Sequence, residues 1–442
     1  MLLGCDSMVA LPNSTRERQT LFAKNSDRPA EECQPLVQSA RAQHPPGTNV
    51  ECQFLELPQA DVTYRHVGSR PWWCWGYEHG FNEHQVVIGN EALASRFPEF
   101  QDPKLIGMDL NRLGLERGRT AAEAVDVITS VVSKYGQGLI RNDLGVRTYD
   151  NGFIVADPAE AYVIETAGHE WVVKRVETAL GISNVHSIRT DWERLSPTAE
   201  SRAVENGWWQ ADSGRFDFAG AYCDFAAAES GRGVYRRARS CGVMDRERGA
   251  IDVRTMISTL SDHADGTIPD EPYRGEITLP RSICMHYRGE GTGNTAASLV
   301  ADLCADGSRL PVYWCSFYSP CLGIFLPTFI EGEVPSVLAV GGENPSDDSP
   351  WWLFRKLGNI VGDEMNFDPG LVSAIRAEWA GFQEELLESA YEMAAVAQRL
   401  IAEGQADQAS RMLTEYMNLN TDNALNTVRD VASRQNVAAT PS

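Results

Sequence analysis

The sequence predicts a layered α+β fold, in which helices lie outside two mainly antiparallel sheets. The first observation is the order of the expected elements, which runs strands, helices, strands, helices along the 442 residues. The second is that neighbouring strands are separated by short turns, which is typical of hairpins. The third is the lack of the regular strand–helix alternation that marks a parallel doubly wound sheet. Neither an internal repeat nor a linker divides the chain, so we expect one domain.

The first thirty residues predict a hairpin. Apolar runs at 5–11 and 19–23 flank a polar turn, and a dense polar cluster at 24–28 ends the second strand. A hairpin can bring this cluster back beside Cys5, a geometry that suits a cysteine nucleophile with activating groups on the neighbouring strand. The plainer interpretation is a buried cysteine on an edge hairpin with a solvated turn. These thirty residues leave both interpretations open.

The next part of the chain predicts strands and two helices. Strands are expected at 51–57, 62–67 and 85–90, a short helix at 108–118, and four strands at 152–156, 161–166, 170–176 and 180–184. Between them, Thr120 and Glu123 form a capping box that begins a second helix, and Gly136 ends it. The last of these strands ends on Asn184, and polar residues at strand ends often lie in functional sites.

The second half is expected to be loop-rich at first and helical at the end. Residues 187–250 are charged and loop-like, with three arginines, Arg236, Arg237 and Arg239, that suit either a solvated face or a site-orienting role. Further elements are expected as a helix at 251–261, a glycine turn at 288–295, strands at 295–303 and 311–330, and helices from 348 to about 436. One of these helices should end at Gly404, with two shorter helices after it.

Composition and charge exclude several classes of function. The net charge of −22 argues against nucleic acid and anionic membranes as partners. Residues 310–330 are uncharged, but three prolines spoil a membrane-spanning helix. A secretory signal is lacking, so a cytoplasmic location and reduced cysteines are expected. The ten cysteines show neither a CxxC pair nor a His–Cys metal spacing, so the sequence predicts no metal and no cofactor.

Several motifs together resemble a known family. Cys5 with residues 22–28, the block from Trp75 to Glu83, the run 107–118 and Gly207-Trp208-Trp209 resemble the secernin branch of the C69 dipeptidase family. Residues 295–300 and 319–327 resemble segments of the wider dipeptidase family. The resemblance runs in order from residue 5 to about residue 330.

The resemblance implies the N-terminal nucleophile hydrolase fold, a four-layer αββα sandwich, with a helical C-terminal region at about 348–436. It implies a leader, residues 1–4, that must be removed from a single domain, residues 5–442, so that Cys5 becomes the first residue. The free α-amine then acts as general base, since the reference pKa values of amine and thiol, about 8 and about 8.5, lie near working pH. The thiolate attacks an amide carbonyl, forms a thioester and releases an amine.

The resemblance also assigns roles to residues. Asp27 holds the cationic α-amine, and Asn184 is the oxyanion-hole donor, with Asn90 as a weaker second donor. Lys24 stands where related amidases carry arginine, although a lysine is a point charge and not a bidentate fork. Arg236 matches the distal arginine of those amidases, with Arg237 and Arg239 as competing assignments.

The implied activity is a cysteine-dependent amide hydrolase that acts on a dipeptide or another small amide. One alternative is an N-acyl amidohydrolase or acyltransferase that acts on a specialised small molecule. Another is a non-catalytic binding or regulatory protein, which an uncleaved leader would favour. In this fold the amine replaces a histidine base, so His186 and His286 are expected to be structural or pocket-lining. A homo-oligomer is possible on this evidence.

Overall fold

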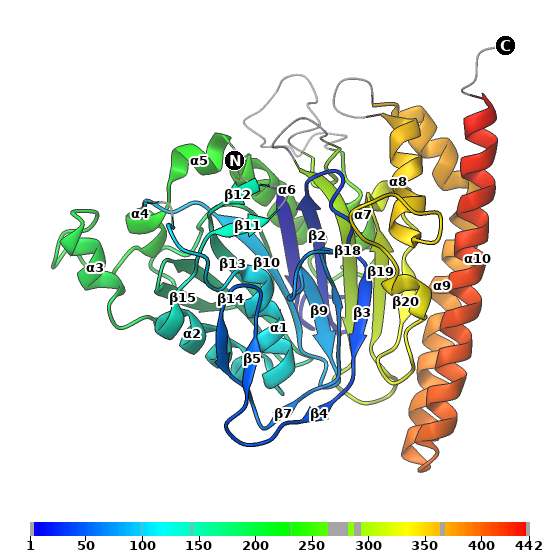
Figure 1. Cartoon of the computed structure of the whole chain (residues 1–442), viewed down its shortest axis with the longest axis horizontal. Coiled ribbons are helices and arrows are strands. Elements are labelled where there is room, and N and C mark those ends of the chain that lie inside the picture. The colour runs from blue at the N-terminus through cyan, green and yellow to red at the C-terminus, as the bar shows by residue number, and fades with distance from the viewer. Residues whose placement is uncertain are drawn as a thin grey trace.

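The core of the molecule is a pair of antiparallel sheets that pack against each other, as the computed structural model shows (Figure 1). The structure describes residues 4–98, 100–142, 145–230, 232–263, 282–286, 293–362 and 367–438. The predicted glycine turn at 288–295 lies largely outside the described residues.

The first sheet has six strands in the order β16-β1-β2-β18-β19-β20. Its strands are β1 (Cys5–Ala10), β2 (Thr20–Arg28), β16 (Ala179–Ile182), β18 (Asn294–Leu303), β19 (Val312–Phe317) and β20 (Leu326–Thr328). All neighbours pair antiparallel, and the register places Cys5 of β1 opposite Ser26 of β2. The predicted hairpin therefore forms, but in the middle of the sheet and not at its edge.

The second sheet has eight strands in the order β17-β15-β14-β13-β10-β9-β8-β3. Its strands are β3 (Leu36–Ser39), β8 (His66–Ser69), β9 (His79–Asn82), β10 (Val87–Leu93), β13 (Asp150–Ala156), β14 (Ala161–Ala167), β15 (Glu170–Arg175) and β17 (Arg194–Leu195). Three small hairpins lie outside the large sheets: β4 (Ala42–Gln43) with β7 (Val62–Thr63), β5 (Asn49–Glu51) with β6 (Glu56–Pro58), and β11 (Ile140–Asn142) with β12 (Gly145–Arg147).

The two sheets are joined by apolar and aromatic side chains. Phe81 of β9 stacks on Tyr313 of β19, with the ring planes 3° apart and the centroids separated by 3.5 Å. Both rings are buried, as is Phe22 of β2, which faces β10 across the same interface. Burying aromatic surface of this size is a main source of folding free energy.

Helices cover the outer faces of both sheets. On the eight-stranded sheet lie α1 (Gly107–Arg117) and α2 (Ala121–Tyr135). The six-stranded sheet is covered by α6 (Gly233–Arg246), α7 (Val253–Leu260), α8 (Pro350–Val361) and α9 (Pro369–Ala402), and α10 (Ala406–Ala438) runs beside α9 (Figure 1). The remaining described helices are α3 (Ala199–Glu205), α4 (Phe218–Tyr222), α5 (Phe225–Ser230) and the 3-10 turns η2 (Pro320–Leu322) and η3 (Ser336–Ala339). This is the predicted αββα arrangement with a helical C-terminal region.

The structure corrects several predicted elements. The region 187–250, expected to be loop-rich, contains the helices α3 to α6, and two of its charged residues, Arg236 and Arg239, are buried. The predicted strand 51–57 is interrupted by a turn and contributes to β5 and β6. One long helix, α10, takes the place of the two shorter helices expected after Gly404. Strand β2 continues through the polar cluster 24–28, and all nine of its residues are buried.

Two further expectations concern helix starts and the membrane. Thr120 caps α2 as predicted, because its side chain accepts a hydrogen bond from the Glu123 backbone N–H. Among the described residues, no helix is both long and apolar enough to cross a bilayer.

Candidate active site

Cys5 lies at the start of β1, with its side chain against the end of β2. The Asp27 backbone N–H donates to Cys5 Sγ at 3.3 Å, and the cysteine residue is only 4% exposed. Cys5 pairs with Ser26 of β2, whereas the pairing of β1 with β16 begins at Ser7, so β2 is the strand that holds this cysteine in place. The hairpin thus brings Asp27 to the thiol, as the sequence predicts.

Asn184 and Arg236 meet at the backbone of Cys5. The Cys5 N–H donates to Asn184 Oδ1 at 2.9 Å, and Arg236 Nη2 donates to the same oxygen at 2.6 Å. Arg236 Nη1 donates to the Cys5 carbonyl at 3.2 Å and to Asp6 Oδ2 at 2.6 Å. Of the three competing arginines, Arg236 is therefore the one that contacts Cys5, whereas Arg239 pairs with Asp262.

Asp27 has one bonded and one unbonded carboxylate oxygen. Thr295 Oγ1 donates to Asp27 Oδ1 at 2.6 Å. The other oxygen, Oδ2, is buried and lacks a hydrogen-bond partner among the residues that the structure describes. A Cβ atom built on Gly4 would lie 2.9 Å from this Oδ2 and 3.1 Å from Arg236 Cζ. The Gly4–Cys5 peptide therefore lies directly beside the unbonded oxygen.

Burial dominates the protonation behaviour of the cluster. It raises the pKa of the Cys5 thiol to about 12, although the nearby Lys24 charge acts in the opposite direction. Burial also raises the pKa of Asp27 well above its usual value, against the effect of Arg236. For Arg236 itself burial would lower the pKa, but Asp6 and Asp27 hold it above its usual value. A thiol in this state needs a base before it can act as a nucleophile.

Lys24 and Asn90 belong to a second polar group, between the two sheets. Lys24 Nζ donates to the Asn90 carbonyl and lies 3.8 Å from Glu91 Oε1. Gly89 makes room for this side chain, since a Cβ at that position would come within 2.3 Å of Lys24 Cδ. Burial would lower the pKa of Lys24, but the charges of Cys5 and Glu91 raise it. Lys24 thus provides a buried positive charge near the thiol.

The side-chain amides of Asn90 and Asn184 point differently from what an oxyanion hole requires. Asn184 presents its oxygen to Cys5, while its Nδ2 donates to the Ala92 carbonyl at 2.7 Å. If the oxygen and nitrogen of the Asn184 amide were exchanged, its NH2 group would face two other donors, the Cys5 N–H and Arg236 Nη2. The hydrogen-bond network therefore fixes the orientation of this amide. Asn90 Nδ2 donates to Asn151 at 3.0 Å. The oxyanion roles of both residues stay predictions.

Sequence reasoning missed three residues of this site: Asp6, Thr295 and Glu91. Asp6 and Thr295 are the direct partners of Arg236 and Asp27, and Glu91 is hydrogen-bonded to Ser7. One signal was available, since Asp6 is a charged residue inside an otherwise apolar strand. The partnership of Thr295 with Asp27 joins positions 268 residues apart, and only the folded sheet reveals it.

Another group has the composition of a metal site. The ligand atoms of His263, Cys284, His286 and Cys321 all lie within 4.8 Å of one another. His263 and Cys321, which are farthest apart in the sequence, lie on opposite sides of β18. A motif of closely spaced ligands therefore does not contain the whole group.

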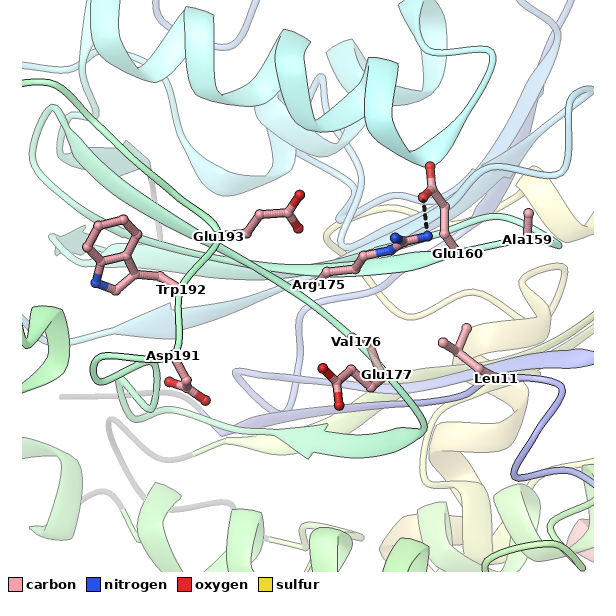
Figure 2. A pocket seen from close by; sticks show the side chains of 9 residues that line it. All are labelled: Leu11, Ala159, Glu160, Arg175, Val176, Glu177, Asp191, Trp192 and Glu193. Carbon is pink, nitrogen blue, oxygen red and sulfur yellow. Dashed lines mark hydrogen bonds and ion pairs between the residues drawn. The ribbon is translucent and has the colours of Figure 1, made fainter. Parts of the chain in front are cut away.

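Figure 2 shows the residues that line a surface pocket of about 510 Å³. Leu11, which lines it, follows β1 at the end opposite to Cys5, about 20 Å along the strand. Its rim is mainly acidic, and Glu160 pairs with Arg175 at 3.1 Å. The pocket is therefore separate from the candidate active site.

Residues 79–245 match the family model described as Peptidase family C69. The matched segment contains Asn90, Asn184 and Arg236, while Cys5 and Asp27 precede it. Peptidases hydrolyse C–N bonds, so the match supports a hydrolase of that class.

Three solved structures are similar to this chain. A mutant of conjugated bile acid hydrolase from Clostridium perfringens is 12% identical with a TM-score of 0.39, over 71% of this chain and 89% of that chain. Penicillin V acylase from Agrobacterium tumefaciens is 15% identical with a TM-score of 0.38, over 71% and 83%. An N-acylethanolamine-hydrolyzing acid amidase orthologue from Caenorhabditis elegans is 14% identical with a TM-score of 0.34, over 67% and 92%. Because these TM-scores are below 0.5, the hydrolase class rests on the family match alone.

Proposed function

We propose that the protein is a cysteine-dependent amide hydrolase whose nucleophile is Cys5 after removal of residues 1–4. The observation that carries the proposal is the buried Asp27 Oδ2, which lies beside the Gly4–Cys5 peptide and lacks a hydrogen-bond partner among the described residues. A buried carboxylate oxygen without a partner is costly. A new cationic α-amine at Cys5 would supply that partner. The domain that acts would then be residues 5–442.

In the proposed mechanism, the residues around Cys5 bind and orient its α-amine. Asn184 Oδ1, 2.9 Å from the Cys5 nitrogen, would accept a hydrogen bond from the α-amine and orient its lone pair toward Sγ. Arg236 anchors Asn184 and the Cys5 carbonyl, so it acts as a positioning residue. In this arrangement Asn184 orients the base, which differs from the oxyanion role predicted from the resemblance.

The chemical steps follow from an unprotonated α-amine. The amine takes the thiol proton, and Sγ attacks the carbonyl carbon of the amide. The C–N bond breaks, the leaving amine takes the proton, and a thioester remains on Cys5. Water, activated by the same amine, then attacks the thioester and releases the acid. Lys24 supports the thiolate because its charge lowers the pKa of Cys5.

The proposed substrate is a small amide, such as a dipeptide. Cys5 is 4% exposed, which favours a small substrate over a large one. A cytoplasmic location belongs to the same proposal. In hydrolysis water attacks the thioester, whereas in acyl transfer an amine attacks it. Analysis of the products formed with an added amine acceptor therefore distinguishes the two reactions.

Intact-mass measurement of the purified protein tests the proposal, together with activity on a panel of dipeptides and N-acyl amines. The mature chain should begin at Cys5, and Cys5→Ala should abolish turnover. Cys33→Ala, a matched change at another buried cysteine, should keep it. A fully active protein that retains residues 1–4, or an active Cys5→Ala variant, would disprove the mechanism. Failure of an amide-mimic thiol probe to label Cys5 in the mature chain would favour a non-catalytic role.

A further inference from the structure

Four side chains outside the candidate active site converge on one buried point. His263 Nε2 lies 3.2 Å from His286 Nε2, and the sulfur atoms of Cys284 and Cys321 lie 3.3 Å and 3.2 Å from the same nitrogen. Cys284, His286 and Cys321 are at most 1% exposed, and His263 is 8% exposed. All four ligand atoms lie within 4.8 Å of one another.

A hydrogen bond at His286 Nε2 accounts for only one of its three close contacts at a time, because a ring nitrogen either donates one proton or accepts at one lone pair. A cation at the centre would interact favourably with all four atoms, because every one of them carries a lone pair that can point to it.

We propose that His263, Cys284, His286 and Cys321 bind one zinc ion. Two thiolates and two imidazoles form a common tetrahedral zinc set. With Zn–S near 2.3 Å and Zn–N near 2.0–2.1 Å, a tetrahedron has edges of about 3.3–3.8 Å, and the three contacts above, at 3.2–3.3 Å, lie at or just below the short end of this range. Binding would release the two thiol protons to solvent, and the two thiolates would balance the charge of the dication.

The site is of the closed, structural type. Four protein ligands fill a tetrahedral zinc and leave no position for water or substrate. Phe367 covers the two histidines, with ring centroids 4.9 Å from His263 and 4.5 Å from His286. The proposed ion thus has an apolar cover and serves to hold chain segments together.

The segments that the ion would join also support the candidate active site. His263 follows α7, Cys284 and His286 precede β18, and Cys321 lies in η2. Asn25 of β2 donates to the carbonyls of Leu260 and Ile283, at 2.8 Å and 3.0 Å, and so ties two of these segments to the strand that carries Asp27.

Met285, between two of the ligands, provides a second connection. Its N–H donates to Thr295 Oγ1 at 3.0 Å, and Thr295 Oγ1 donates to Asp27. Two hydrogen bonds therefore connect the backbone between the ligands Cys284 and His286 to the Asp27 carboxylate. The proposed zinc ion would fix the backbone that orients Thr295.

Metal content of the whole purified chain tests the proposal without reference to activity. Elemental analysis should find about one zinc per chain, and Cys284→Ala and Cys321→Ala should each lose it. Cys315→Ala removes another buried thiol, on β19, and should retain the zinc. Equal zinc content in all three variants would overturn the site.

A second measurement remains decisive if the variants fail to fold. Wild-type chain prepared with cobalt in place of zinc should show the intense visible absorption of a tetrahedral cobalt–thiolate centre. Folded wild-type protein that takes up neither zinc nor cobalt in stoichiometric amount would disprove the proposal. Because neither readout uses Cys5, failure of the proposed hydrolase function would leave this result unaffected.

Discussion

Arg236 and Asp6 form an ion pair with 2.6 Å between Nη1 and Oδ2, and both side chains are fully buried. Asp6 is the neighbour of Cys5 on β1, while Arg236 comes from α6 on the outer face of the sheet. The same guanidinium reaches Asn184 and the Cys5 carbonyl. The arginine therefore links the outer helix layer to the start of β1.

Removal of this arginine should destabilise the protein and abolish activity. Arg236→Met leaves Asp6 as an uncompensated buried charge, which typically costs about 3–5 kcal/mol. Urea denaturation measures the loss, and Arg237→Met, one position along the helix, is the matched control with little effect. Adding Asp6→Asn to Arg236→Met should recover much of the stability but not the activity. Equal stability of Arg236→Met and Arg237→Met would contradict the assignment.

The Thr295–Asp27 hydrogen bond should control turnover more than folding. Thr295→Val removes the donor to Asp27 Oδ1 at nearly constant volume and should lower kcat by roughly ten-fold or more, since a hydrogen bond to a charged group contributes about 1.5–3 kcal/mol. Thr295→Ser keeps the hydroxyl and should retain most of the activity. The pH dependence of kcat provides a second readout, because loss of this donor raises the pKa of Asp27 further. Identical pH profiles for the valine and serine variants would argue against the role.

Glu91 should make stability depend on pH. Burial raises its pKa from 4.5 to about 7, so the folded state binds a proton that the unfolded state has already lost. Its stabilising contribution is fully present below about pH 4.5 and is lost as pH rises through about 7. Thermal unfolding measured at about pH 5 and about pH 8 gives the stability that each protein loses between these two pH values. This loss should be smaller for Glu91→Gln than for wild type, by roughly 1–3 kcal/mol. Glu177→Gln, at an exposed position, should follow the wild-type curve.

The hydroxyl of Tyr313 should contribute nothing to stability. It is buried without a hydrogen-bond partner among the described residues, and the ring stacks on Phe81 between the sheets. Tyr313→Phe should therefore keep the free energy of unfolding or raise it. Tyr222→Phe is the matched control, because its hydroxyl donates to the Ala199 carbonyl at 2.6 Å, and it should lose about 1 kcal/mol. A larger loss at Tyr313 than at Tyr222 would refute the prediction.

Much of the fold was predictable because it depends on local patterns. Thr120 and Gly136 mark the ends of α2, and short apolar runs separated by turns predict β13, β14 and β15. The end of β2 was not predictable in the same way. Lys24 and Asp27 look like turn residues, yet each is buried in a strand because its partner comes from another part of the chain.

The candidate site was predictable where a residue type was enough and not where an orientation was needed. Proximity of Asp27 to Cys5 follows from the hairpin alone. The amide orientation of Asn184 depends on Arg236, a residue 52 positions away. Likewise, the four possible zinc ligands meet only through the pairing of β18 with its neighbours. Tertiary contacts of this kind leave no spacing signal in the sequence.

In the proposed maturation, the burial of Gly4 would set the order of events. The residues that surround the Gly4–Cys5 bond include Asp27 and Arg236. The complete surroundings of this bond therefore exist only after most of the chain has been synthesised and folded. A separate peptidase would need the bond exposed, and so would have to act on the nascent chain. Self-cleavage would instead require the finished fold and would act as a checkpoint that only correctly assembled molecules pass. A pulse-chase experiment that times leader loss against folding would therefore identify the processing agent.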